Sequence, residues 1–234
     1  MSRHLHERVA NISNALIVSP HLDDGVFSCG AFMAEHTGCT VLTVFAGAPD
    51  EASMQTEWDK KCGFENALVA WRVRRAEDCA ATSSLNADCE WLNFVDDQYA
   101  PDQNKGEIAP AILECAYRLH PSAVFVPMGL FHSDHLRVSA ACLDLVRQRA
   151  ISCCIAYEDA LYRRKAGAVQ ERMVSFAAGG VLATPVSPMT AAPDCVQKRN
   201  AVSQYNSQLR AFGWQGFEDL FMPERYWLIE RNHE

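Results

Sequence analysis

The fold of this chain is decided by an apolar run that ends in a polar turn, Asn14–Ser19 (NALIVS) followed by Pro20–Asp24 (PHLDD). A short apolar run closed by a proline predicts a buried strand. The next segment, Gly25–Glu35, has apolar side chains at helical spacing, which predicts a helix directly after the turn. This part of the chain therefore predicts a strand, a polar turn and a helix in succession.

The same alternation continues along the chain. Further strands are predicted at Thr40–Phe45, Glu90–Val95 and Ala123–Val126, and helices at Gly63–Leu85, Ile108–Leu119 and Asp134–Arg149. Strands that alternate with helices imply right-handed crossovers and a sheet covered on both faces. The sequence therefore predicts an α/β fold with a Rossmann-like, mostly parallel sheet and helices on both faces.

The C-terminal part is expected to add strands at one edge of this sheet. The segments Gln170–Phe176 and Arg225–Glu230 are candidate edge strands, and a helix is predicted from about Cys195 to Phe212. No internal repeat or linker interrupts the sequence, so we expect one domain over residues 1–234.

Composition limits the classes of partner. The chain has 234 residues, is 49% hydrophobic and carries 29 acidic against 21 basic residues, a net charge of −8. A core can therefore form without disulfides or structural metals. Nucleic acids and anionic membranes need clustered Lys and Arg, which an acidic chain does not supply. We expect a small-molecule substrate and no nucleic-acid partner.

The cysteines indicate a reducing compartment. There are ten of them, without a CxxC pair, and several lie in apolar contexts where Cys acts as a small hydrophobe. Met1–Arg8 is polar and does not resemble a secretory signal. These features predict reduced thiols and a cytoplasmic protein.

One uncharged segment, Met173–Pro193, is long enough to cross a bilayer. It contains two adjacent glycines and three prolines, which argue against a continuous helix and for a strand followed by an apolar loop. We therefore expect no transmembrane segment. The loop could line a site for an apolar aglycone or lipid, or pack a subunit interface, so a homo-oligomer stays open.

Two polar clusters follow predicted strands. His21, Asp23 and Asp24 come after the first strand, and His132-Ser-Asp-His135 comes soon after Ala123–Val126. Ligands of such folds bind beyond the carboxyl ends of the strands. Catalytic zinc needs about three N or O ligands and an open position. A His and an Asp three apart in a tight turn, completed by a His from a neighbouring strand end, satisfy this need.

A plainer interpretation must be weighed beside this one. An Asp pair before a helix could cap it, and single histidines are more often ordinary surface or core groups. Capping accounts for Asp24. It does not account for four residues of metal-ligand type at a second strand end, so the two clusters together favour a metal site.

These motifs resemble those of the PIG-L/LmbE-like family of zinc-dependent de-N-acetylases, whose signatures are PHxDD and HxDH. The similarity extends to four further segments, Arg74–Ala81, Phe94–Tyr99, Tyr157–Asp159 and Lys198–Gln208. The matches follow the family's order over most of the chain. The resemblance implies that His21, Asp24 and His135 bind zinc, and Fe²⁺ is the alternative because a His₂Asp set accommodates both ions.

The resemblance also implies roles for other polar residues. Asp23 would be the general base, and His132 would stabilise the oxyanion or protonate the leaving amine, with Asp134 orienting it. Arg74 and Asp96 would help to hold the substrate.

Arg74 and Asp96 also have plainer interpretations. Arg74 could pair with Glu77 or Glu114, and Asp96 could simply form a turn. Both alternatives stay open at this point.

The chain departs from the family's pattern at several positions. Leu22 and Gly25 replace the Pro and Glu of the commoner PHPDDE turn, and Leu130 stands where some members have a Tyr. The last change removes a group that could polarise the substrate carbonyl and leaves more of that work to His132.

The expected activity is removal of an N-acetyl group from a GlcNAc-type amino sugar of a glycoconjugate or natural-product intermediate. One alternative is an amidase that acts on another small amide, of the thiol-conjugate amidase type. Another is a non-catalytic metal-binding protein on the same fold, although a decayed enzyme usually loses some of its ligands, and this chain has the full set.

Overall fold

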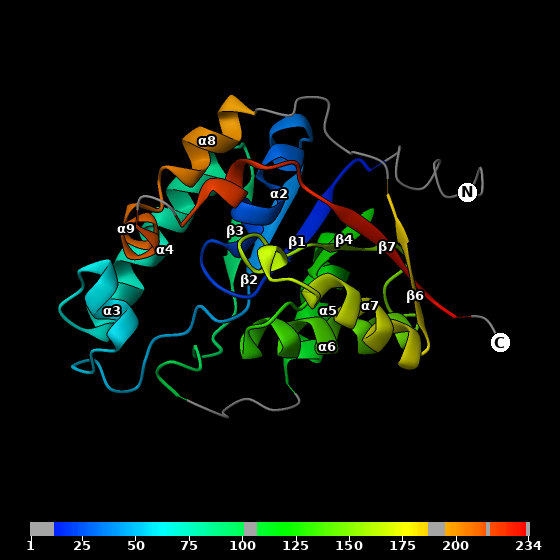
Figure 1. Cartoon of the computed structure of the whole chain (residues 1–234), viewed down its shortest axis with the longest axis horizontal. Coiled ribbons are helices and arrows are strands. Elements are labelled where there is room, and N and C mark those ends of the chain that lie inside the picture. Colours follow the sequence, from blue (N-terminus) through cyan, green and yellow to red (C-terminus); the bar gives the residue numbers. More distant parts are fainter. Residues whose placement is uncertain (1–11, 101–106, 187–194, 214–215, 233–234) are drawn as a thin grey trace.

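The protein folds around a single seven-stranded sheet, shown in Figure 1. The computed structural model describes residues 12–100, 107–186, 195–213 and 216–232. The strands are β1 (Ala15–Ser19), β2 (Cys39–Thr43), β3 (Asp88–Trp91), β4 (Ala123–Pro127), β5 (Cys154–Tyr157), β6 (Val181–Pro185) and β7 (Tyr226–Arg231).

The strand order is β3-β2-β1-β4-β5-β7-β6. The first five strands in this order are mutually parallel, β7 runs antiparallel to β5, and β6 runs antiparallel to β7. This confirms the predicted mostly parallel sheet with C-terminal edge strands. From β1 the chain moves outward to β2 and β3 and then returns to β4 on the other side of β1, which makes β1/β4 the topological switch point.

Helices cover both faces of the sheet, as predicted (Figure 1). The α-helices are α2 (Asp24–Glu35), α3 (Glu57–Cys62), α4 (Ala67–Ser84), α5 (Ile108–Leu119), α6 (Ser133–Arg147), α7 (Ala168–Ala178), α8 (Val196–Val202) and α9 (Asn206–Phe212), and two 3-10 helices are η1 (Tyr162–Arg164) and η2 (Glu218–Phe221). One core contains side chains of α2, α4 and α8, and the other contains side chains of α5, α6 and α7.

The first strand shows why the sheet is central. All five residues of β1 are buried, with Ile17 in one core and Leu16 and Val18 in the other. Side chains alternate between the two faces of a strand, so a strand covered on both faces must be apolar throughout. This requirement explains the continuous apolar run that precedes the polar turn.

The predicted edge strand at Gln170–Phe176 is wrong, because these residues belong to α7. Val169, Met173 and Phe176 recur at intervals of four and three residues, and all three pack into the core that contains α5 and α6. The edge strand is β6, which starts directly after Gly180. Of the predicted apolar loop, residues 187–193 lie outside the described residues.

The predicted helix from Cys195 to Phe212 is two helices, α8 and α9, separated at Ser203–Tyr205. Tyr205 lies at the break and is fully buried, with its hydroxyl bound to Asp78 on α4 at 2.8 Å. All ten cysteines are free thiols. Within the described ranges, no helix is long and apolar enough to cross a membrane.

Candidate metal centre and active site

The two polar turns predicted from the sequence meet at the switch point of the sheet. The first follows β1 and the second follows β4, and these two strands are paired directly in parallel, with Ile17 opposite Phe125. Their carboxyl ends therefore lie side by side, and the turns beyond them share one space. This is where ligands bind in open α/β sheets.

The turn after β1 is fixed by its own side chains. Ser19 Oγ donates to the carbonyl of His21 at 2.6 Å and accepts the N–H of Gly25 at 2.8 Å. Asp24 Oδ2 accepts the backbone N–H of His21 at 2.9 Å. These bonds direct the side chains of His21 and Asp24 to the same side. Asp23 is the N-cap residue of α2 but makes no side-chain capping bond, whereas Asp24 lies in the first turn of the helix, where an acidic side chain is favourable.

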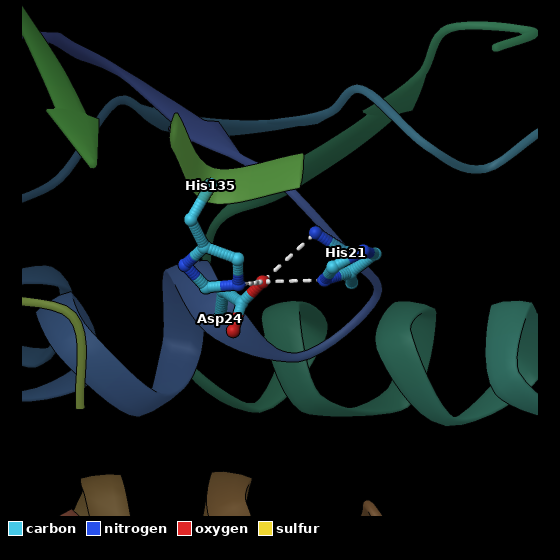
Figure 2. A group of neighbouring side chains, drawn as sticks. All are labelled: His21, Asp24 and His135. Carbon is cyan, nitrogen blue, oxygen red and sulfur yellow. Dashed lines mark hydrogen bonds and ion pairs between the residues drawn. The ribbon is translucent and has the colours of Figure 1, made fainter. Parts of the chain in front are cut away.

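Figure 2 shows the group formed by His21, Asp24 and His135. Asp24 Oδ2 lies 3.2 Å from His21 Nδ1 and 3.1 Å from His135 Nε2. One atom from each residue falls within 4.8 Å of the others, a spacing that can hold a metal ion. The structure thus brings the three predicted ligands together, and their binding of a metal stays a prediction.

His135 is oriented for such a role. Its ring is 1% exposed, and its Nδ1 lies 2.6 Å from Asp159 Oδ1. In the neutral ring, a carboxylate at Nδ1 fixes the proton there, so that Nε2, which lies beside Asp24, carries the lone pair that a metal ion would bind. Nε2 is buried without a hydrogen-bond partner. A buried, unsatisfied acceptor beside a carboxylate and a second imidazole fits a divalent cation.

Asp134 orients His21 and not His132, which corrects the sequence-based expectation. Its Oδ2 lies 2.9 Å from His21 Nε2, and its Oδ1 accepts from Arg137 at 3.1 Å. The reason is geometric. The first turn of α6 directs the Asp134 carboxylate toward the turn after β1, and only the backbone N–H of Asp134 reaches His132.

His132 is the N-cap of α6, and its Nδ1 accepts the N–H of Asp134 at 3.3 Å. In a neutral ring this bond leaves the proton on Nε2, so the ring can donate a hydrogen bond to a ligand. Burial, followed by the neighbouring His21 and His135, lowers the pKa of His132. The ring packs edge-on against His21, with centroids 5.1 Å apart.

The carboxylates make this group attract positive charge. Burial lowers the pKa of His21, but Asp96, Asp134 and Asp24 outweigh it and hold this pKa well above its ordinary value. In the same way burial lowers the pKa of His135, and Asp24 leads the carboxylates that raise it to about 9. Protons and a divalent cation therefore compete for the same site.

A second group of possible ligands, His21, His132 and Asp134, shares the His21 ring. It is the weaker candidate for a metal, because its donors already have partners. Asp134 is bound by Arg137 and by His21, and His132 Nδ1 caps α6. In the first group His135 Nε2 has no such partner.

Asp23 lies beside the first group and lines the adjoining cavity. Burial, and then the Asp24 carboxylate, raise the pKa of Asp23 to about 8. A bound cation lowers it from that value, toward the range in which a general base works at neutral pH. Within the described part of the chain, the Asp23 carboxylate makes no hydrogen bond, so its oxygens can accept one from a ligand or water.

The adjoining cavity has a volume of about 270 Å³. Its polar side includes Arg74 and Asp96, and Arg74 Nη1 lies 3.6 Å from Asp96 Oδ2. Arg74 therefore does not pair with Glu77, which accepts from Ser207. Arg74 Nε is buried without a partner.

Asp96 forms a turn as well as lining the cavity. Its Oδ1 accepts the N–H of Gln98 at 3.0 Å, so the turn-forming interpretation is correct but incomplete.

Sequence reasoning placed Asp159 in a segment similar to the family but gave it no role, and it missed the aromatic wall of the cavity. Asp159 lies just beyond β5, and a carboxylate at a third strand end was the signal that could have identified it. The wall is formed by Phe27, Trp58, Tyr162 and Phe212. These four come from separate elements, and nothing in the local sequence marks them. Tyr162 meets His135 edge-on, with ring centroids 4.9 Å apart.

Together, the fold and the clustered donors define an α/β protein with a candidate metal centre at its switch point. The sequence matches the family PIG-L, described as GlcNAc-PI de-N-acetylase, over residues 16–146, more than half of the chain. The chain belongs to this deacetylase family. No curated protein matches the sequence.

Solved structures share the whole fold. A triple mutant of a deacetylase from the teicoplanin biosynthetic pathway is 26% identical, with a TM-score of 0.74 over 94% of this chain and 99% of that one. The zinc inhibited form of teicoplanin deacetylase is 23% identical, with a TM-score of 0.73 over 94% and 99%. N,N′-diacetylchitobiose deacetylase from Pyrococcus horikoshii is 15% identical, with a TM-score of 0.55 over 88% and 74%.

Proposed function

We propose that this protein is a metal-dependent hydrolase that removes the N-acetyl group from a GlcNAc-type amino sugar of a glycoconjugate or natural-product intermediate. The observation that carries the proposal is the meeting of His21, Asp24 and His135, with the Nε2 atom of His135 buried 3.1 Å from Asp24 Oδ2 and without a hydrogen bond. Membership of the PIG-L family and the deacetylases among the solved structures support the reaction class.

A divalent cation, zinc or alternatively Fe²⁺, would be held by His21 Nδ1, Asp24 Oδ2 and His135 Nε2. When bound, such an ion lowers the pKa of water toward about 7 and polarises an amide carbonyl. The remaining side chains can be assigned from their positions around this group.

Asp23 acts as the general base and takes a proton from the attacking water, because its carboxylate is adjacent to the donor group and otherwise unbound. His132 Nε2 donates a hydrogen bond to the carbonyl oxygen as negative charge develops there, and the proton that Asp23 has taken from water passes to the leaving amine. Asp134 and Asp159 hold the rings of His21 and His135 from behind.

The cavity supplies the site for the sugar. Arg74 offers a guanidinium group and Asp96 an acceptor on its polar side, which suits a ring with several hydroxyl groups. Trp58 and Phe212, 5.5 Å apart, provide an apolar face opposite. Trp58 is held by a hydrogen bond from its Nε1 to Gln208 at 3.0 Å.

Acetate release from N-acetylglucosamine and its glycosides, measured before and after removal of metal by a chelator, tests the proposal. We expect release that the chelator abolishes and one equivalent of zinc or Fe²⁺ restores. Because one similar structure is a zinc inhibited form, the zinc arm is titrated from one equivalent to excess.

A matched pair of variants sharpens this test. Asp24→Ala removes the carboxylate shared by both imidazoles, whereas Asp50→Ala removes an exposed acid that does not line the cavity. Asp50→Ala should retain metal and turnover, and Asp24→Ala should lose both. Acetate release that persists in the metal-free protein would exclude the proposed mechanism.

A further inference from the structure

The rim of the catalytic cavity carries an exposed aromatic side chain that the proposed reaction does not use. Phe131 lies between β4 and α6, directly before His132, and is 62% exposed. Leu136, on the first turns of α6, is 39% exposed. Single exposed apolar residues are ordinary on protein surfaces. The exposure of Phe131 therefore indicates a function only if other features show that the fold fixes this side chain in place.

The backbone at Phe131 provides the first of these features. Its φ is 64°, and the N–H of His132 donates to the carbonyl of Leu130 at 2.8 Å, which closes a three-residue γ-turn. A γ-turn with positive φ is rare and strained, and a bulky residue is unusual there. The other described non-glycine residues with positive φ are Asn86, His120, Arg149 and Leu161.

The first three of those residues lie at helix C-terminal ends, where a left-handed residue is common. Leu161 and Phe131 do not: Leu161 lines the catalytic cavity, and Phe131 directly precedes His132, which also lines it. Strained backbone that is not explained by a helix end tends to mark functional sites.

The γ-turn is also held firmly from outside. Asp159 Oδ2 accepts the N–H of Gly129 at 2.9 Å and the N–H of Leu130 at 3.1 Å. The same carboxylate uses its other oxygen to hold the ring of His135. Phe131 is therefore placed by the residue that also orients a predicted metal ligand, so its distance from the reacting groups is fixed.

Phe131 lines a second cavity, and its ring contacts a residue that lines the catalytic cavity. Its ring lies 5.9 Å from the ring of Tyr162, which lines the catalytic cavity. The second cavity has a volume of about 330 Å³ and is also lined by Leu130, Leu136 and residues around the start of α7. Lys165 Nζ lies 3.7 Å from the centre of its ring.

We infer that Phe131 and Leu136 form a binding site for an apolar aglycone of the amino-sugar substrate, which leaves the catalytic cavity past His132. This inference rests on the proposed function. The catalytic cavity, at about 270 Å³, is smaller than the roughly 300–1,000 Å³ of typical ligand pockets, so a glycoconjugate must extend beyond it. The exposed apolar side chains that follow the cavity residue His132 or directly precede it are Leu136 and Phe131.

The test compares substrates that share the sugar and differ in the aglycone. The quantity measured is the ratio of kcat/KM for phenyl or octyl N-acetyl-glucosaminide to kcat/KM for N-acetylglucosamine. Phe131→Gly is the decisive variant, because glycine keeps the positive φ that places His132 and removes only the ring. We expect the ratio to fall about tenfold, the effect of losing one buried aromatic contact.

Leu136→Ala should lower the same ratio by a smaller factor. Tyr117→Ala is the matched control, because Tyr117 is an aromatic side chain that is 60% exposed on α5 and lines neither cavity. The phenyl and octyl arms distinguish an aromatic from an aliphatic aglycone. A ratio that is unchanged in Phe131→Gly would overturn the inference. A wild-type dimer that dissociates in this variant would also overturn it, because Phe131 and Leu136 would then belong to an interface between two copies of the chain.

Calorimetric titration separates failure of this inference from failure of the proposed function. If the wild type releases no acetate from any of the sugars, the proposed function fails. The aglycone site is then judged by the Kd of phenyl N-acetyl-glucosaminide, which should rise about tenfold in Phe131→Gly but not in Tyr117→Ala. Equal values of Kd in the two variants would overturn the inference without reference to turnover.

Discussion

The turns after β1 and β4 supply the two halves of the candidate site, but they are held in different ways. The turn after β1 is closed by Ser19 and Asp24, which lie within it or directly before it. The turn after β4 is held by Asp159, beyond a different strand, and contains a strained residue at Phe131. The polar residues of both turns can be recognised in the sequence, whereas the way in which Asp159 holds the second turn from a distance cannot.

The two turns are also interlocked. The His21 ring of the first turn is backed by Asp134 in the second, and the His135 ring is backed by Asp159. Each imidazole therefore depends on a carboxylate outside its own turn. Variants can therefore distinguish the proposed metal ligands from the carboxylates of Asp134 and Asp159, which orient the imidazole rings.

The largest effect is expected for Asp24→Ala. Asp24 Oδ2 is the atom that contacts the backbone of His21 and both imidazoles. Without it, we expect metal content to fall from one ion per chain to near zero and acetate release to be lost. Metal analysis by mass spectrometry after dialysis checks this, with Asp50→Ala beside it. Full occupancy in the Asp24 variant would remove this residue from the ligand set.

Asp23→Asn should uncouple metal binding from catalysis. Asp23 makes no contact that holds the first turn through its side chain, so the ion should stay at one per chain. Loss of the general base should lower kcat by about 10²–10⁴. Parallel measurements of kcat and metal content test this. Turnover equal to that of the wild type would show that another group takes the proton.

The carboxylates behind the rings should have intermediate effects. Asp159→Asn and Asp134→Asn should each weaken metal affinity by about 10–100-fold, the range typical of groups that orient metal-binding histidines. The effect of Asp159→Asn should be larger, because Asp159 also holds the backbone of Gly129 and Leu130. Competition with a coloured chelator measures both. The opposite order would mean that His21 needs its partner more than His135 does.

The last comparison concerns stability and uses one glycine close to each turn, Gly129 and Gly25. Gly129 has a φ of +83°, and an added Cβ would lie 2.6 Å from Ser139 Cβ. Gly129→Ala should therefore lower the free energy of unfolding by about 2–4 kcal/mol, from strain and overpacking together. At Gly25 the added Cβ would meet Val41 Cγ1 at 3.0 Å. Urea denaturation of Gly25→Ala should show a change within about 1 kcal/mol, because better helix propensity offsets the crowding.

The sequence predicted most of the parallel half of the fold. The spans of β1, β2 and β4 follow from short apolar runs, and the predicted helix Ile108–Leu119 coincides with α5. The antiparallel edge was predicted less well. Gln170–Phe176 was expected to be an edge strand, yet the spacing of its apolar residues places one helical face on the core.

The candidate site shows the same division. The donors His21, Asp24 and His135 could be predicted because they lie in motifs at two strand ends. The partner of Asp134 could not, since it depends on how the first turn of α6 faces the neighbouring turn. The cavity wall was equally inaccessible, because Trp58 on α3 and residues of α9 meet only after the chain has folded.

The central claim is that one divalent ion joins the two turns through His21 Nδ1, Asp24 and His135 Nε2. Anomalous diffraction at the zinc edge, from crystals of the protein loaded with one equivalent of zinc, tests it most directly. The expected result is a single peak about 2.0–2.2 Å from these three donors, with Asp134 and Asp159 behind the rings. A peak bound instead by the other nitrogen of His21, with His132 and Asp134, or no peak at the switch point, would contradict the account.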